Sequence, residues 1–230
     1  MHENPRASPR IWQPDWLVLR EMARVLREVL ADPALSLRGA RVLDFGCGSR
    51  PYEGWFAAAG AHYHGADVDA AHEIRIGSDG TLDCGEGEYD MVASFQVLEH
   101  VWDVATYLRE ARRVLRRDGN LLLSTHGTWL YHPHPTDYRR WTADGLRREV
   151  EAHGFRLARM EPVVGPLAWT TVFRSLGMAH FLKPLPLVGA PLAGIAASLM
   201  NARAWVEECV TPRGITAVNA CTYVGLFRRG

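Results

Sequence analysis

Short apolar runs alternate along the chain with stretches in which apolar residues recur every three or four positions. The short runs are typical of buried strands and lie at residues 42–45, 62–66, 90–95, 120–125, 155–164 and 217–227. The helical spacing covers residues 12–30, 52–59, 104–115 and 142–153. Asp15 and Thr142 stand where helix N-caps are expected, and Gly154 stands where a helix ends. This alternation predicts an α/β fold with a mostly parallel sheet and helices on both faces.

The same pattern divides one expected domain, residues 1–230, into four parts. Residues 1–39 would form an N-terminal helical cap, and residues 40–164 a core of alternating strands and helices. Residues 165–214 are rich in apolar residues, and we expect two inserted helices, or a lid, before a last strand in residues 215–230. Three uses of the insertion stay open: packing on the sheet edge, a dimer interface, and contact with a membrane or a lipid-linked substrate.

Charge and cysteine content narrow the class of partner. Lys plus Arg and Asp plus Glu both number 26, and this balance disfavours a nucleic-acid partner. None of the four cysteines forms a C-x-x-C pair and no signal peptide is evident, so a reduced, cytoplasmic protein is expected. The nearest approach to a membrane span, residues 184–202, is broken by three prolines. We therefore expect a small-molecule partner, no stable membrane insertion, and a monomer or homodimer.

The segment from Arg41 to Gly48 carries the clearest chemical signal. An apolar strand ends in two glycines one residue apart, which lets a ligand approach the backbone. Asp44 sets a carboxylate beside that turn, favouring a cationic or amine-bearing ligand. Pro51 occupies the position of a third glycine, so a dinucleotide pyrophosphate turn is disfavoured. Asp67 follows Gly48 by 19 residues, at the end of the next strand, where it could bind a ribose diol.

Four segments resemble the motifs of class I S-adenosylmethionine-dependent methyltransferases, and the fourth-strand motif is similar to that of the type 11-like subgroup. The four segments are residues 42–48, 65–69, 88–101 and 113–124, and the resemblance as a whole covers residues 40–164. Asn120 stands where that family usually has a second turn glycine. The resemblance implies a Rossmann-like, seven-stranded sheet and an enzyme that uses S-adenosyl-L-methionine.

The resemblance also implies where that cofactor binds. Asp44, Gly46, Cys47 and Gly48 would surround its methionine end, and Asp67 and Val68 its ribose and adenine. Asp79 and Gly80, or else Asp83, would approach the adenine edge. Ser94, Phe95 and Gln96 would line the region near the sulfonium, although Phe95 also suits plain core packing.

Candidate catalytic groups follow the fourth and fifth strands, where the resemblance implies that the substrate lies. They are His100, His126, His134 and Tyr138. No metal is expected, because His132, His134 and Asp137 have no further ligand at metal-binding spacing. In a purely structural interpretation, Asp137 and Arg140 fix this loop and Thr142 caps the next helix.

These observations predict methyl transfer to a small or medium-sized organic acceptor, with oxygen as the expected methylated atom. Tailoring of a saccharide or glycolipid and tailoring of a natural product both fit. Two alternatives remain: an enzyme that cyclises the cofactor and releases methylthioadenosine, and a non-catalytic module that binds the cofactor.

Overall fold

A seven-stranded sheet forms the centre of the computed structural model, which describes residues 4–69 and 71–230. Its order is β3-β2-β1-β4-β5-β7-β6. The strands are β1 (Arg41–Phe45), β2 (His62–Asp67), β3 (Ile74–Arg75), β4 (Tyr89–Phe95), β5 (Leu115–His126), β6 (Phe155–Val163) and β7 (Thr222–Arg229). The first five run parallel, and β7 runs antiparallel to β5 and β6. The predicted Rossmann-like, mostly parallel α/β sheet is confirmed.

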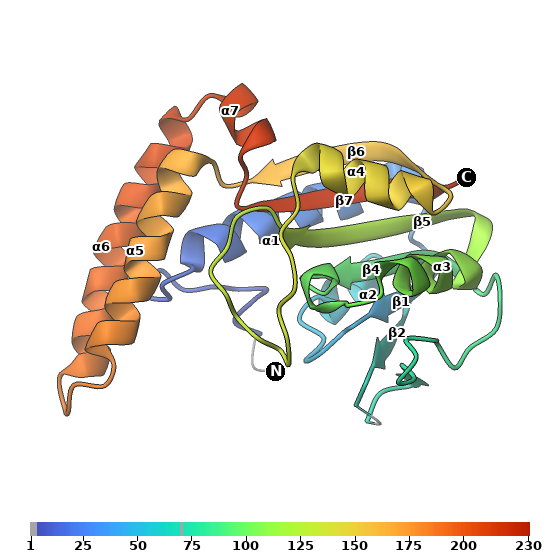
Figure 1. Cartoon of the computed structure of the whole chain (residues 1–230), viewed down its shortest axis with the longest axis horizontal. Coiled ribbons are helices and arrows are strands. Elements are labelled where there is room, and N and C mark those ends of the chain that lie inside the picture. Colours follow the sequence, from blue (N-terminus) through green and yellow to red (C-terminus); the bar gives the residue numbers. More distant parts are fainter. Residues whose placement is uncertain (1–3, 70) are drawn as a thin grey trace.

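Helices cover both faces of this sheet (Figure 1). On one face α1 (Trp16–Leu30), α2 (Glu53–Ala58) and the start of α5 share an apolar core with Leu122 and Val224. On the other, α3 (Val104–Val114) and α4 (Ala143–Ala152) pack on Val92 and Phe227. Two short 3₁₀ helices, η1 (Pro33–Leu35) and η2 (Leu98–His100), complete the core. Burial of apolar faces on both sides explains why the strands read as continuous apolar runs.

Three local predictions were wrong or incomplete. The first helix begins at Trp16 rather than residue 12, since a residue before Pro14 avoids the helical region. Asp15 makes no side-chain capping bond there, whereas Thr142 accepts the amide hydrogen of Gly145 as predicted. The last strand begins at Thr222 rather than residue 217, because Pro212 precedes a short helix, α7 (Arg213–Val218).

The region between β6 and β7 forms two long antiparallel helices, as predicted for residues 165–214, followed by α7. They are α5 (Pro166–Leu182) and α6 (Gly189–Val210). This α5–α6 hairpin extends away from the sheet (Figure 1). Small buried residues, among them Ala193 and Ala197, allow α6 to pack closely against α5. No helix among the described residues is long and apolar enough to cross a membrane.

The hairpin also holds the N-terminal segment, residues 4–15, against the body. The buried Asn201 on α6 donates from Nδ2 to the carbonyl oxygens of Ile11 and Gln13, at 2.8 and 2.7 Å. Residues 1–3 of the predicted N-terminal cap lie outside the described residues. The cap therefore reaches its position through a side-chain contact with a helix almost 190 residues later.

Asn201→Ala should lower the free energy of unfolding by about 1–3 kcal/mol, because two partly buried backbone carbonyls lose their donor. Thermal denaturation measures the loss, and limited proteolysis should show faster cleavage within residues 4–15. Ser198→Ala is the matched control, since Ser198 Oγ bonds only to Gly194 O within the same helix. Equal melting temperatures and equal cleavage for the two variants would contradict this role.

Candidate active site

A cavity of about 1250 Å³ opens at the carboxyl ends of the parallel strands. Residues that follow β1, β2, β4 and β5 all line it, including Gly46, Asp67, Gln96 and His126. The N-terminal segment closes it with Gln13 and other residues. Parallel strands deliver their carboxyl ends to one edge of the sheet, and ligands of open α/β sheets bind there. The volume exceeds that typical of a single small-ligand site, so two ligands can lie together.

Asp44 at the cavity wall is a buried carboxylate with incomplete hydrogen bonding. Asp44 is only 2% exposed, one carboxylate oxygen accepts the Tyr63 hydroxyl hydrogen at 2.5 Å, and Oδ1 has no hydrogen-bond partner among the described residues. Burial raises the pKa of Asp44 to about 7. A buried acceptor without a donor is costly, so this oxygen suits an ammonium or amine on a ligand.

The two glycines of the first turn leave the backbone open beside Asp44. Gly46 and Gly48 have φ of +84° and +49°, in the left-handed region that glycine favours. A Cβ on Gly46 would lie 2.7 Å from a methyl of Val97, whereas a Cβ on Gly48 would meet open space. Asp67 ties this turn to β2 by accepting the Gly48 amide hydrogen at 2.8 Å.

Most of the predicted cofactor-binding residues share this cavity. Those lining it are Asp44, Gly46, Cys47, Gly48, Asp67, Val68, Asp79, Gly80, Phe95 and Gln96. Val68 is 70% exposed, which leaves an apolar surface free beside Asp67. Ser94 does not line the cavity: it is buried and accepts the hydroxyl hydrogen of Tyr107. Asp83, the weighed alternative to Asp79, also lies outside the lining.

Four histidines gather at the other side of the cavity. His100, His126, His132 and His134 line it, and their rings pack edge to face at 4.9 to 6.3 Å between centroids. His100 Nδ1 lies 2.7 Å from the carbonyl oxygen of Thr136. A carbonyl oxygen only accepts, so Nδ1 carries the hydrogen and Nε2 keeps its lone pair.

His126 is held by a buried carboxyl. Its Nε2 lies 3.3 Å from Oε1 of Glu99, and its Nδ1 lies 3.3 Å from the Thr222 hydroxyl. Burial raises the pKa of Glu99 to about 7 and lowers the pKa of His126 well below its ordinary value. Both pKa shifts favour the neutral form of the group, the protonated carboxyl of Glu99 and the unprotonated imidazole of His126. His126 also stacks on Trp129 with ring planes 6° apart, so its ring is held rigidly in the wall.

The loop between β5 and α4 is fixed by one ion pair. Asp137 accepts two hydrogen bonds from Arg140 and one from the His132 amide, and the guanidinium holds the pKa of Asp137 well below its usual range. Asp137 therefore holds the loop in place, as the structural interpretation of this segment predicted. Tyr138 lies outside the cavity, 43% exposed and against Trp102.

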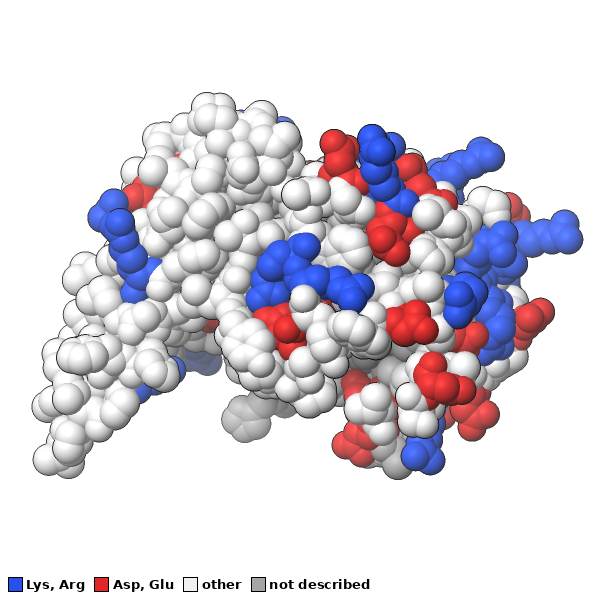
Figure 2. Space-filling view, viewed as in Figure 1, with Lys and Arg blue, Asp and Glu red and all other residues white. Residues whose placement is uncertain are grey.

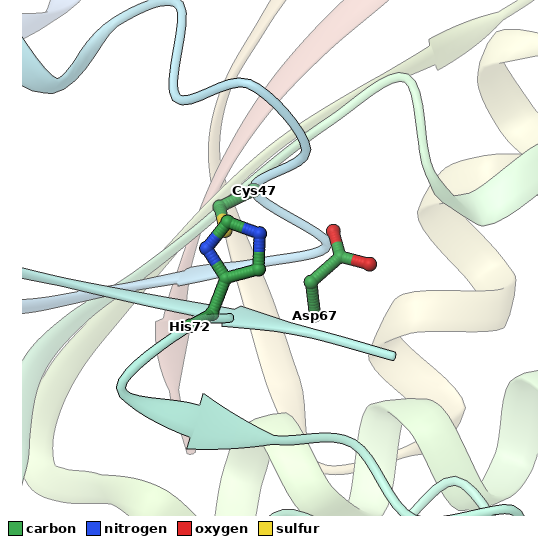
Figure 3. A group of neighbouring side chains, drawn as sticks. All are labelled: Cys47, Asp67 and His72. Atoms are coloured by element: carbon green, nitrogen blue, oxygen red, sulfur yellow. The ribbon is translucent and has the colours of Figure 1, made fainter. Parts of the chain in front are cut away.

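Two groups of described residues bring possible metal ligands within 4.8 Å of one another. The first is Cys47, Asp67 and His72, with the Cys47 thiol lying against the His72 ring (Figure 3). The guanidinium of Arg50 donates to His72 Nδ1 at 3.3 Å, and burial raises the pKa of Cys47 to about 12. A neighbouring cation and a neutral thiol oppose metal binding.

The second group is Glu99, His100 and His132, in the wall already described. The Nδ1 atoms of both histidines lie within hydrogen-bond distance of backbone carbonyl oxygens, which leaves their Nε2 atoms for substrate or solvent. This group suits proton transfer at least as well as metal binding.

Sequence reasoning missed several lining residues. Gln13, Asp15, Tyr52 and Trp129 all line the cavity. Burial raises the pKa of Asp15, which we predicted only as a helix cap. No local pattern could reveal them, because each side chain reaches the cavity through tertiary packing.

Comparison with known proteins defines the class. The methyltransferase domain family matches residues 18–159. A Mycolicibacterium smegmatis protein named a probable S-adenosylmethionine-dependent methyltransferase is 31% identical over 159 residues, or 62% of this chain and 58% of that protein. The ubiquinone biosynthesis O-methyltransferase of Marinobacter nauticus is 30% identical over 119 residues, which are 44% of this chain and 50% of that protein. The matched part thus spans about half the length of these relatives.

Solved structures agree in fold. The cyclase SpnF matches with a TM-score of 0.58 and 20% identity over 90% of this chain and 80% of its own. An S-adenosylmethionine-dependent methyltransferase from Mesorhizobium loti matches with a TM-score of 0.52 and 17% identity, over 87% of this chain and 98% of its own.

The chain therefore belongs to the methyltransferase domain family, in the class I fold that uses S-adenosylmethionine. The cavity fits this cofactor, because Asp44 offers an unpartnered buried carboxylate oxygen and the glycine turn leaves open backbone beside it. The individual cofactor contacts stay predictions.

Asp67→Ala should weaken binding of S-adenosylhomocysteine by about 1–3 kcal/mol, because a ribose diol would lose hydrogen bonds to a charged acceptor. Titration calorimetry measures the change. Asp69→Ala, an exposed acid two residues on and outside the cavity lining, should bind like the unaltered protein. Unchanged affinity in Asp67→Ala would remove the ribose assignment.

Affinity for S-adenosylhomocysteine should fall about tenfold between pH 8 and pH 6, since the raised pKa of Asp44 leaves it mostly protonated at pH 6. The ionised form is the one that attracts a ligand ammonium, so affinity rises with pH through about 7. Asp44→Asn should bind weakly across this range and lose the pH dependence. A flat profile in the unaltered protein speaks against Asp44 as the ammonium acceptor.

Proposed function

We propose that the protein transfers a methyl group to a hydroxyl oxygen of a small or medium-sized organic acceptor, with His100 as general base. The supporting observation is the 2.7 Å hydrogen bond from His100 Nδ1 to the Thr136 carbonyl oxygen. It leaves Nε2 ready to accept a proton in the cavity that holds Asp44 and Asp67. A hydroxyl must lose its proton on methylation, and a positioned histidine suits that step.

S-adenosylmethionine, when bound, supplies an electrophilic methyl group on a positively charged sulfur. The chain contributes alignment and exclusion of water. Tyr52 and Phe95 are buried at the cavity wall and pack edge to face at 4.9 Å, which makes that side apolar and rigid. A water-poor pocket favours a reaction in which the sulfonium charge disperses. His126, fixed between Glu99 and Trp129, would position the acceptor rather than take its proton, because both ring nitrogens face protein groups.

Oxygen as the methylated atom is supported by the imidazole groups at this end of the cavity, which can hydrogen-bond a hydroxylated acceptor. The name of the Marinobacter nauticus relative, an O-methyltransferase, agrees. Saccharide, glycolipid and natural-product acceptors all fit this chemistry.

His100→Gln should lower kcat by a factor of about 10² to 10⁴, the usual contribution of a general base, while leaving affinity for S-adenosylhomocysteine unchanged. Turnover is followed with a panel of hydroxylated acceptors by release of S-adenosylhomocysteine. His153→Gln, on the far side at the end of α4, is the matched control. Full activity of His100→Gln would exclude His100 as the base, and release of methylthioadenosine would favour the cyclising alternative.

A further inference from the structure

The outer end of the α5–α6 hairpin exposes large apolar side chains. We call residues 181–188 the hairpin tip; they contain the connection between the two helices. Leu187 is 99% exposed and Phe181 is 75% exposed, and Leu185 and Val188 beside them are also exposed. Exposed apolar side chains that cluster in this way mark an interaction surface.

The apolar surface continues from the tip along one side of α6. Leu192, Ile195 and Leu199 are all exposed and recur at helical spacing. The opposite side of α6 carries the small residues that pack on α5. The hairpin therefore has a packed inner side, an apolar outer side and an apolar end.

The charged residues of the hairpin are cationic except at the base of α6, where Glu207 and Glu208 lie. No acid occurs between Glu161 and Glu207, whereas Arg174, Lys183 and Arg203 lie in that interval. Most of the hairpin surface is white in Figure 2, with a few blue side chains and some red near its base. Glu207 bonds to Thr171 and Arg203. The tip therefore offers a cation, Lys183, among apolar residues, which complements an anionic lipid surface.

Trp12 lies against α6 at Gly194, on the flank of the helix that also carries Asn201. It is 52% exposed, and a Cβ on Gly194 of α6 would lie 3.7 Å from its own Cβ. The Arg10 guanidinium lies 5.3 Å from the Trp12 ring centroid. Tryptophan and arginine both suit the headgroup layer of a bilayer, where one end of a side chain is apolar and the other is wet.

We propose that the hairpin tip docks the protein on an anionic lipid bilayer. Phe181, Leu185 and Leu187 enter the acyl boundary, and Lys183 lies among the headgroups. A second copy of the chain would cover one side of a helix, whereas the tip is convex and exposes apolar side chains around its end. Since no described helix can cross a membrane, the contact is shallow. This docking does not depend on the methylated acceptor.

Flotation of the full chain with vesicles tests this proposal. Vesicles of phosphatidylcholine alone are compared with vesicles that also contain a quarter phosphatidylglycerol, at low and high salt. We expect binding to the anionic vesicles, weakened by salt because the headgroup attraction is screened.

Three variants locate the contact. Phe181→Ser with Leu187→Ser should reduce binding at least about tenfold, because two inserted apolar side chains are lost. Lys183→Glu should reduce binding to anionic vesicles at least about fivefold. Val210→Ser, 66% exposed at the other end of α6, is the matched control and should bind normally. Unchanged melting temperatures exclude misfolding.

Three results would overturn the proposal. The first is no binding of the unaltered protein to either kind of vesicle, and the second is an equal loss of vesicle binding in Val210→Ser and in the tip variant. The third is a dimer in sedimentation analysis that Leu187→Ser dissociates, together with no vesicle binding.

Discussion

Parallel pairing of β1, β2, β4 and β5 is the constraint on which the rest of the structure depends. Each strand ends at the same edge, so the side chains after four strands meet in one cavity although they are far apart in sequence. The edge is lined by backbone groups and by carboxylates at Asp44 and Asp67, while imidazoles follow β4 and β5. The sheet thus brings the glycine turn and Asp67 to one side of the cavity and the histidines to the other, without a second domain.

The histidine side of the cavity is rigid because the loop between β5 and α4 is tied to the strand ends. Tyr138 donates its amide hydrogen to the Glu99 carbonyl, and Trp141 donates its own to the His126 carbonyl. The Asp137–Arg140 pair then holds the intervening backbone, including the Thr136 carbonyl that orients His100. A buried ion pair adds little net stability, so its value here lies in fixing geometry. Because burial drives His126 toward its neutral form, this ring adds no positive charge beside a cationic ligand.

The fold was largely predictable because local patterns determine it. Six strands follow from apolar runs, and the glycine turn with Asp67 indicates the ligand edge. The seventh strand, Ile74–Arg75, is a two-residue edge strand and carries no periodic signal. The cavity wall was less predictable. Ser94 faces away from the cavity, on the side of β4 that packs against Tyr107. Asp15 lines the cavity instead of capping α1. In both cases the direction of the side chain is determined by tertiary packing, which a local pattern does not reveal. Histidine positions followed from motif spacing, whereas the engagement of both nitrogens of His126 required the structure.

The N-terminal segment connects the hairpin to the cavity. Asn201 of α6 binds the carbonyls of Ile11 and Gln13, and Gln13 and Asp15 line the cavity a few residues further on. Trp12, between them, faces outward beside α6. Because residues 4–15 take part in no strand pairing, their position rests on side-chain contacts with Asn201 of α6, with Arg27 of α1 and with Ser49 after the glycine turn.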